Sequence, residues 1–229
     1  MNNYGQLGNT DVAKNETANT PVSVTGLSDA RQIAVGVCHA CARRKGGQVV
    51  CWGYNGYGQL GNETNVDANK PEPVVGPEDF VDITVGQYHS CGVRTGGEVL
   101  CWGQNSSGQL GGSDGNSDLP VAVSGLEDVA SVHAGLTHTC ALHTDGTVSC
   151  WGGNKNGQLG NGTTTQPKSP EAAPVPDLTK VVMLTAGANH NCVLRASGPP
   201  LCWGQNSSGQ LGDSSYDTQS SPKAVVDLP

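Results

Sequence analysis

The chemically reactive side chains of this chain are mostly arranged at fixed intervals. Its nine cysteines include four pairs whose members lie ten residues apart. The pairs are Cys41/Cys51, Cys91/Cys101, Cys140/Cys150 and Cys192/Cys202. A histidine precedes the first cysteine of each pair by two residues, at His39, His89, His138 and His190. Thiols and imidazoles in such a pattern can form disulfides, bind a metal or act in nucleophilic catalysis.

For the cysteines we predict one disulfide per pair, which requires an oxidising compartment and hence an extracellular or cell-surface location. Reduced thiols acting as small buried apolar groups are the alternative, and they would suit the cytoplasm. A metal site is the third reading, since Cys38 and Cys41 have the spacing of zinc ligands. Each pair with its histidine offers only three ligands and no evident fourth, which disfavours metal.

The histidines recur once per unit, whereas a catalytic histidine is normally unique and lies beside a nucleophile and a carboxylate. We therefore predict a structural role, such as hydrogen bonding to the backbone of a neighbouring turn. His133 and His143 lie outside the pattern and are expected to be exposed.

The second cysteine of each pair is followed by a tryptophan. These are Trp52, Trp102, Trp151 and Trp203. Their indoles are expected to pack between units, with each N–H finding an acceptor.

These residues sit in an internal repeat. Gly-Gln-Leu-Gly occurs five times, at 5–8, 58–61, 108–111, 157–160 and 209–212, and successive tryptophans are 50, 49 and 52 residues apart. A fixed period of this size indicates a solenoid, a propeller or an array. We predict one repeat domain over 1–229. Its units are 4–53, 54–103, 104–152, 153–204 and a partial unit 205–229.

Each unit contains four short extended segments. The first begins with proline and valine, the second alternates and ends in glycine, the third carries His-x-Cys and the fourth runs into Cys-Trp-Gly. Proline suits the start of a strand, and the last such segment is expected near 223–226. No window has a helical period, so we predict an all-β propeller of about four four-stranded blades plus a half blade, forming an open arc or part of a larger ring.

The turn at 143–148 tests the cysteine pairing. A three-residue loop with Gly146 in the left-handed conformation pairs His143 with Thr147, which places Cys140 opposite Cys150. Such a non-hydrogen-bonded pair has its Cα atoms roughly 4.5 Å apart, within reach of a disulfide. A two-residue loop would instead place Cys140 opposite Trp151.

Composition excludes several functions. The net charge is −8 and no run of Lys or Arg occurs, so nucleic acids and anionic membrane surfaces are disfavoured as partners. No apolar stretch approaches the roughly 20 residues of a membrane span. Residues 114–118 copy the opening of a calcium loop but lack its later Gly and Glu. Sequons occur at Asn15, Asn62, Asn105, Asn161 and Asn206; they could carry glycans in a eukaryotic secreted protein, but we interpret them as turn sequences. No catalytic residue, cofactor or metal site is predicted.

The pattern Gly-x-x-His-x-Cys, a glycine turn, then Cys-Trp-Gly-x-Asn-x-x-Gly-Gln-Leu-Gly resembles the regulator of chromosome condensation repeat family over essentially the whole chain. The Cys-x-Cys-Trp form is similar to the bacterial, surface-associated branch. The resemblance implies a propeller, usually of about seven blades. It also implies several possible roles: guanine-nucleotide exchange on a small GTPase, ultraviolet sensing, or inhibition of β-lactamases through one face of the disc.

Two of those roles are disfavoured by the sequence. The even periods leave little room for the inserted wedge that performs exchange, and no tryptophan lies beside the histidine motif as in the photoreceptor. We therefore predict a non-enzymatic scaffold that binds a protein partner through loops on one face. The candidate loops are 62–70, 112–119, 161–170 and 213–220. The alternative is a regulator of a small GTPase acting by exchange. An open arc also exposes sheet edges through which two copies could associate.

Overall fold

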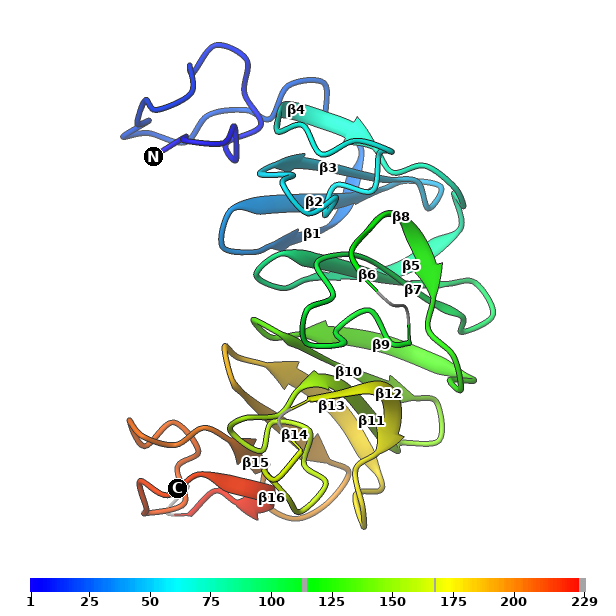
Figure 1. Ribbon diagram of the computed structural model, residues 1–229, viewed down its shortest axis with the longest axis vertical. Helices are drawn as coiled ribbons and strands as arrows, with labels where there is room; N and C mark the ends of the chain where they lie inside the picture. The colour runs from blue at the N-terminus through cyan, green and yellow to red at the C-terminus, as the bar shows by residue number, and fades with distance from the viewer. Residues whose placement is uncertain (113–114, 167, 227–229) are drawn as a thin grey trace.

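The computed structural model describes residues 1–112, 115–166 and 168–226. In these residues the chain is all-β, with sixteen strands in four antiparallel sheets of four strands each, and it contains no helix. None of the described segments could therefore cross a membrane as a helix. The sheets, called blades one to four, follow one another from top to bottom in Figure 1, with the two chain ends at opposite ends of the stack. The blades thus form an open arc.

Each blade is a meander whose strands pair in chain order. Blade one contains β1 (Ala30–Val35), β2 (His39–Arg44), β3 (Val49–Gly53) and β4 (Ala68–Pro73). Blade two contains β5 (Phe80–Val85), β6 (His89–Arg94), β7 (Val99–Gly103) and β8 (Ser117–Ala122). Blade three contains β9 (Val129–Ala134), β10 (His138–His143), β11 (Val148–Gly153) and β12 (Lys168–Pro174). Blade four contains β13 (Val181–Ala186), β14 (His190–Arg195), β15 (Leu201–Gly204) and β16 (Gln219–Ala224).

Each blade takes its fourth strand from the next sequence unit. The expectation that proline begins this strand is wrong, because Pro73 and Pro174 end β4 and β12. Proline is tolerated there because one side of an outer strand needs no ladder hydrogen bond. The last strand begins at Gln219 rather than near 223, and it completes blade four. The first Pro-Val segment, at 21–24, forms no strand, and residues 1–29 belong to none of the four sheets.

The segment that runs into Cys-Trp-Gly is therefore the third strand of its blade, and its expected place as the fourth is wrong. It pairs on one side with the His-x-Cys strand and on the other with the strand taken from the next unit. This inner position buries the second cysteine of every pair. The four cysteines concerned are Cys51 in β3, Cys101 in β7, Cys150 in β11 and Cys202 in β15.

The predicted hairpin register is confirmed. The backbone N–H of His143 donates to the carbonyl of Thr147 at 2.9 Å, and Gly146 has a φ of 81°. Cys140 lies opposite Cys150, and their Cα atoms are 4.1 Å apart. Every blade repeats this register between its second and third strands. The turn chemistry therefore fixes which side chains meet across the hairpin.

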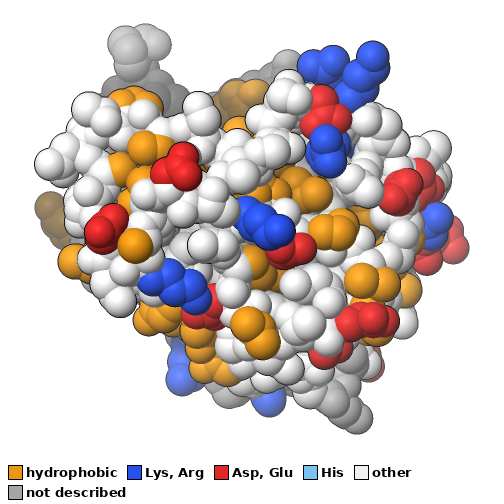
Figure 2. All heavy atoms as spheres, turned by 90° about the horizontal axis from the view of Figure 1, so that it is seen from above, with side chains coloured by type: hydrophobic (Ala, Val, Ile, Leu, Met, Phe, Trp, Pro, Cys, Tyr) orange, Lys and Arg blue, Asp and Glu red, His pale blue; other side chains and the backbone are white. Residues whose placement is uncertain are grey.

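The core lies between blades rather than within one. Ile83 in β5 is only 4% exposed because blade one covers it, and Val132 and Leu184 occupy the same position at the next two junctions. Ile33 is the equivalent residue in β1, yet it is 58% exposed because no described blade precedes it. Viewed from the blade-one end, hydrophobic side chains alternate with charged and other polar groups (Figure 2). Each junction also buries one tryptophan.

Candidate interaction site

The variable loops all emerge on one face of the arc. In a four-stranded meander, the connection after the first strand and the connection after the third strand leave at the same end. Loops 62–70, 112–119, 161–170 and 213–220 follow the third strand of each blade, although 113–114 and 167 lie outside the described residues. We call this end of the arc the loop face. It also carries the short connections 36–38, 86–88, 135–137 and 187–189.

A buried asparagine holds each variable loop at its base. Asn55 is fully buried; its side-chain oxygen accepts from the Leu60 backbone N–H at 2.9 Å, and its nitrogen donates to the Thr64 carbonyl at 2.8 Å. The other blades repeat the first bond, through Asn105 to Leu110, Asn154 to Leu159 and Asn206 to Leu211. The loops therefore vary in sequence above a constant, hydrogen-bonded base.

The burial of these asparagines also shows whether two of the five sequons are accessible. Asn206 is fully buried and donates to Asp213 and Ser215, and Asn105 is 7% exposed. Their amides are inaccessible in the folded chain, which agrees with interpreting these positions as turn residues. The calcium-like motif begins at Asp114, which lies outside the described residues. In the part of the chain that is described, no group of three or more acidic, His or Cys side chains could hold a metal ion.

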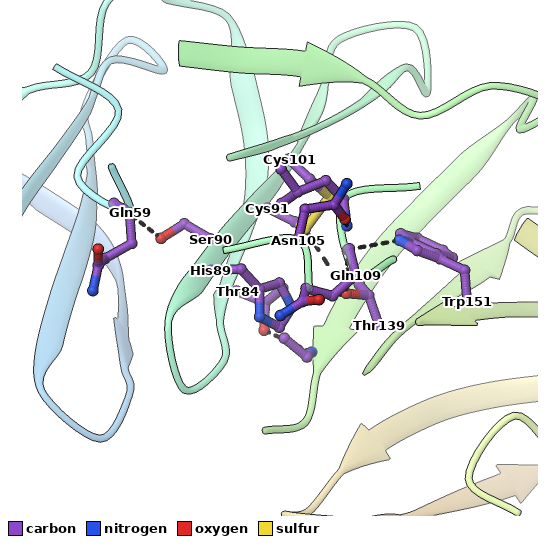
Figure 3. Close-up of a disulfide and its surroundings, with 12 residues drawn as sticks. Gln59, Thr84, His89, Ser90, Cys91, Cys101, Asn105, Gln109, Thr139 and Trp151 are labelled. Carbon is purple, nitrogen blue, oxygen red and sulfur yellow. Dashed lines mark hydrogen bonds between the residues drawn. A yellow bond between two sulfur atoms is a disulfide. The ribbon is translucent and has the colours of Figure 1, made fainter. Parts of the chain in front are cut away.

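The histidines link consecutive blades through side chains. His89 Nε2 lies 2.9 Å from Thr139 Oγ1, and the Thr139 hydroxyl donates to the Gln109 carbonyl at 3.3 Å (Figure 3). A hydroxyl has one proton, so Nε2–H must donate to Thr139. The neighbouring junctions repeat this relay, as His39–Ser90–Gln59 and His138–Asn191–Gln158. The expectation of a bond to a backbone turn is therefore wrong, because the partner is a side chain of the next blade.

Burial keeps these three imidazoles neutral. It lowers the pKa of His39 and His138 to about 4 and that of His89 to about 3. Their Nδ1 atoms have no hydrogen-bond partner among the described residues. A proton added at Nδ1 would place an unpaired charge inside a junction. His190 ends the series half-buried, with its pKa lowered by burial and no described blade beyond it.

The glycine of Gly-x-x-His makes room for the ring. A Cβ added to Gly86 would overlap Cε1 of His89, and the same holds for Gly135 with His138 and Gly187 with His190. At Gly36 the His39 ring is 3.4 Å from an added Cβ, and the clash is with the Gly86 carbonyl of the next blade at 2.4 Å. The glycine is therefore needed both for the imidazole and for the close approach of the next blade. The motif Gly-x-x-His is thus a packing unit of the blade junction.

Two tryptophans donate to the same glutamine carbonyls that accept from the histidine partners. Trp151 Nε1 donates to the Gln109 carbonyl at 2.9 Å, and Trp203 Nε1 donates to the Gln158 carbonyl at 3.0 Å. Trp52 donates to Gln6 in the N-terminal segment at 3.1 Å. The expected N–H acceptor is missing only for Trp102, whose Nε1 has no hydrogen-bond partner among the described residues. The Gln of Gly-Gln-Leu-Gly therefore ties one blade to the next through its backbone oxygen.

The structure contains four disulfide bonds, one across the central hairpin of each blade. They are Cys41–Cys51, Cys91–Cys101, Cys140–Cys150 and Cys192–Cys202. Cys51 and Cys101 are fully buried and belong to the cores of the first two junctions, where they pack with apolar side chains. With their sulfurs joined in pairs, these eight cysteines offer no thiolate to a metal or a substrate.

The remaining reactive groups of the pattern lie apart from one another. Cys38 is free and half-buried, and burial raises its pKa. His133 and His143 are half-buried rather than exposed, so that expectation is wrong. His133 Nε2 lies 3.1 Å from Ser131 Oγ, and His143 Nδ1 lies 2.8 Å from the Glu127 carbonyl. None of these groups forms a nucleophile–base–carboxylate arrangement with its hydrogen-bond partners.

Sequence reasoning missed a cluster of aromatic rings on the loop face. Ring centroids are 4.9 Å apart for Tyr4 and Tyr54, 5.6 Å for Tyr54 and Tyr88, and 5.2 Å for Tyr57 and Tyr88. All four side chains are half-exposed. We call Tyr4, Tyr54, Tyr57 and Tyr88 the tyrosine patch. A signal was available, because four of the five tyrosines lie in loop-face positions of the first two units, whereas Tyr216 stands alone.

The loop face also has an apolar hollow of about 280 Å³, whose lining residue Gly86 lies two positions before Tyr88 in the same connection. It is lined by the ends of the innermost strands and the connections that follow them, including Val37, Gly86 and Leu136. Backbone bonds join these connections, with Gln87 N–H donating to Leu136 and Leu136 N–H to Ala188. The loop face thus combines a rigid inner rim, an aromatic patch and four variable loops. The exposed rings and loops of this face are suited to binding, whereas the buried histidines are hydrogen-bonded within the blade junctions.

Repeated four-stranded blades with a histidine and a tryptophan at each junction define a β-propeller class. The chain matches the family described as RCC1-like domain over residues 1–228, and it belongs to that family. The predicted propeller fold is confirmed by similar solved structures. Human WBSCR16 gives a TM-score of 0.88 at 24% identity, covering 100% of this chain and 61% of that one.

Two structures of yeast RCC1 (Prp20, from Saccharomyces cerevisiae) are also similar. One, bound to Kap60, gives a TM-score of 0.81 at 22% identity, covering 91% of this chain and 52% of that one. The other gives 0.80 at 22% identity, covering 91% and 53%. The chain therefore spans about three fifths to one half of these proteins. No curated protein sequence matches it. The bacterial-type form remains a prediction.

Proposed function

We propose that the chain is a non-enzymatic scaffold that binds a protein partner through its loop face. The observation that carries this proposal is that the repeated side chains all bond within the chain, whereas the loops of variable sequence project from them on one face. The repeated Asn, His, Trp and Gln groups form bonds within loops and between blades, and the four variable loops project from that support. Loops held on a rigid scaffold are the usual location of binding residues.

The repeated residues have structural roles in this proposal. The eight paired cysteines close the central hairpins, and His39, His89 and His138, with their tryptophan neighbours, hold consecutive blades together. Neutral, buried imidazoles are poor candidates for catalysis at neutral pH, because they have no access to a substrate. His190 and Trp203 belong to the same pattern at the last described blade.

The alternative is a regulator of a small GTPase acting by nucleotide exchange. Similarity to yeast RCC1 supports a protein partner of some kind, since that protein has been solved bound to Kap60 and is described as having binding properties to Gsp1p and histones. The net charge of −8 still argues against nucleic acid, because phosphates would be repelled. We also propose an extracellular or cell-surface location, supported by the four disulfides, with the cytoplasm as the alternative.

Site-specific cross-linking tests the scaffold proposal. A photoreactive benzoylphenylalanine is placed on the loop face at Tyr57 or Tyr216, and on the opposite face at Thr95 or Thr144. We expect the same discrete protein adduct from loop-face positions in native extracts and none from the opposite face. Adducts only from the opposite face would refute the proposal. Nucleotide release from a panel of small GTPases tests the alternative, and stimulation well above background would replace the scaffold with an exchange factor.

A further inference from the structure

The tyrosine patch is the feature of the loop face that most clearly breaks the repeat. Tyr57 lies in the Gly-Gln-Leu-Gly loop of the second unit, where the later units have Ser107, Asn156 and Ser208. Tyr88 precedes the junction histidine, where the later units have Thr137 and Asn189. The rings contact one another but remain half-exposed. Clustered tyrosines at a surface are enriched at the centres of protein interfaces.

The surroundings of the patch are acidic. The pKa of Tyr54 is raised first by burial, then by the neighbouring Tyr57 and Tyr88, and then by the carboxylate of Asp67. The three loops around the rings, at 1–20, 54–70 and the described part of 104–118, carry five carboxylates against two lysines. One of those lysines, Lys14, already places its ammonium 3.6 Å from Asp67. The carboxylate at the edge of the patch therefore accepts a cation within the chain itself.

Aromatic faces attract cations through the ring quadrupole, and a nearby carboxylate adds to that attraction. The apolar hollow of the same face, which shares the connection 86–88 with Tyr88, can take an aliphatic side chain or the stem of a long one. We infer that the patch is the docking site for a basic segment of the protein partner, with an arginine or lysine lying over the tyrosine faces near Asp67. This inference rests on the proposed function and names the partner's chemistry at the same face.

Fluorescence anisotropy of short labelled peptides tests it. One peptide alternates arginine and glycine, and its control alternates glutamate and glycine. We expect the arginine peptide to bind and the glutamate peptide not to bind. Tyr57→Leu keeps an apolar side chain but removes the ring, and should weaken binding about 3- to 10-fold. Tyr57→Phe keeps the ring and should retain binding. Asp67→Asn keeps an oxygen for the Asn55 N–H, a bond of 2.8 Å, and should also weaken binding.

Tyr216→Leu is the matched control, because Tyr216 is 76% exposed in a loop of blade four and belongs to no cluster among the described residues. It should leave the affinity for the short arginine peptide unchanged, because that peptide binds at the tyrosine patch of the first two blades and does not reach the loop of blade four. Far-ultraviolet circular dichroism of each variant shows that the fold is retained. Failure of the arginine peptide to bind, or equal weakening by Tyr57→Leu and Tyr216→Leu, would overturn the inference. Cross-links from Tyr216 without binding at the patch would leave the scaffold proposal intact and remove only the assignment of a basic partner.

Discussion

Mild acid should destabilise the folded chain through the histidines buried at its blade junctions. His39, His89 and His138 are at most 1% exposed and donate from Nε2, and protonation would add a charge at Nδ1, which has no partner among the described residues. In the unfolded chain each imidazole is solvated, with a pKa of about 6.5. In the folded chain the pKa falls to about 4, about 3 and about 4. Below pH about 6.5 the unfolded state therefore binds more protons.

The direction and size of the stability change with pH follow from the difference between the folded and unfolded histidine pKa values. A lowered folded pKa means that full stability is present above pH about 6.5 and is lost as the pH falls towards the folded pKa. Between pH about 7 and about 5, each histidine contributes a loss of about 2 kcal/mol, so the three together contribute about 6 kcal/mol. That is comparable with the whole stability of an ordinary domain, roughly 5 to 15 kcal/mol. His133 and His190, whose pKa values are also lowered by burial, act in the same direction.

Urea unfolding monitored by tryptophan fluorescence at a series of pH values measures the effect. Carboxylates such as Asp79, whose pKa is lowered by its hydrogen bond to Arg94, titrate below the range from pH about 7 to about 5 and so do not contribute to the slope there. His89→Gln offers an N–H in place of Nε2–H but does not titrate, and should remove about one third of the slope due to the three histidines. His143→Gln, away from the junctions, is the control. A flat stability between pH about 6.5 and about 4, or a slope unchanged by His89→Gln, would refute the reasoning.

Three further predictions concern the junctions. Graded reduction should open Cys192–Cys202 first, because Cys192 is half-exposed whereas the other paired cysteines are buried. Alkylation and peptide mass spectrometry follow the order of opening, and simultaneous opening of all four disulfides would contradict this prediction. Trp151→Phe should cost about 1 kcal/mol more than Trp102→Phe in urea unfolding, because only Trp151 loses a hydrogen bond, and equal losses would show that the bond is unimportant. Gly86→Ala should cost about 2–4 kcal/mol, because the new Cβ overlaps both the His89 ring and the Gly135 carbonyl of the next blade. Gly26→Ala is the control and should cost about 1 kcal/mol, because only its positive φ of 71° is strained; similar thermal shifts for the two variants would argue against this steric account.

The hairpin could be predicted from the sequence because its determinants are local. Gly146 sets the turn, the turn sets the pairing, and the pairing places Cys140 opposite Cys150. The identity of the fourth strand in each blade could not be obtained in this way. A unit boundary drawn at Cys-Trp-Gly is a choice about sequence periodicity, whereas the pairing of β4 with β3 depends on contacts made after the chain has crossed the loop at 54–67.

The histidine partners were missed for a similar reason. His39 and Ser90 are 51 residues apart, and the bond between them exists only because two blades pack side by side. Local sequence indicates that the histidine is structural but not what it contacts. The tyrosine patch is also non-local, since Tyr4 meets Tyr54, and Tyr57 meets Tyr88, only when three loops gather at one face. Burial is equally non-local, since Ile33 and Ile83 are the same residue type in equivalent positions.

The junction relay also shows that the blades are not interchangeable. The residue after the junction histidine must accept a bond from the preceding blade, and Ser90, Thr139 and Asn191 do so. The equivalent residue of blade one is Ala40, which has no acceptor in its side chain. If two copies joined with blade four of one against blade one of the other in the same geometry, His190 would face Ala40, at a cost of about 1–3 kcal/mol for the unpaired imidazole. Trp52 is already bonded to Gln6 of its own chain, so the joining segment would also have to displace that bond. A junction between two copies in this geometry would therefore be weaker than the internal junction of blades three and four, which keeps both bonds.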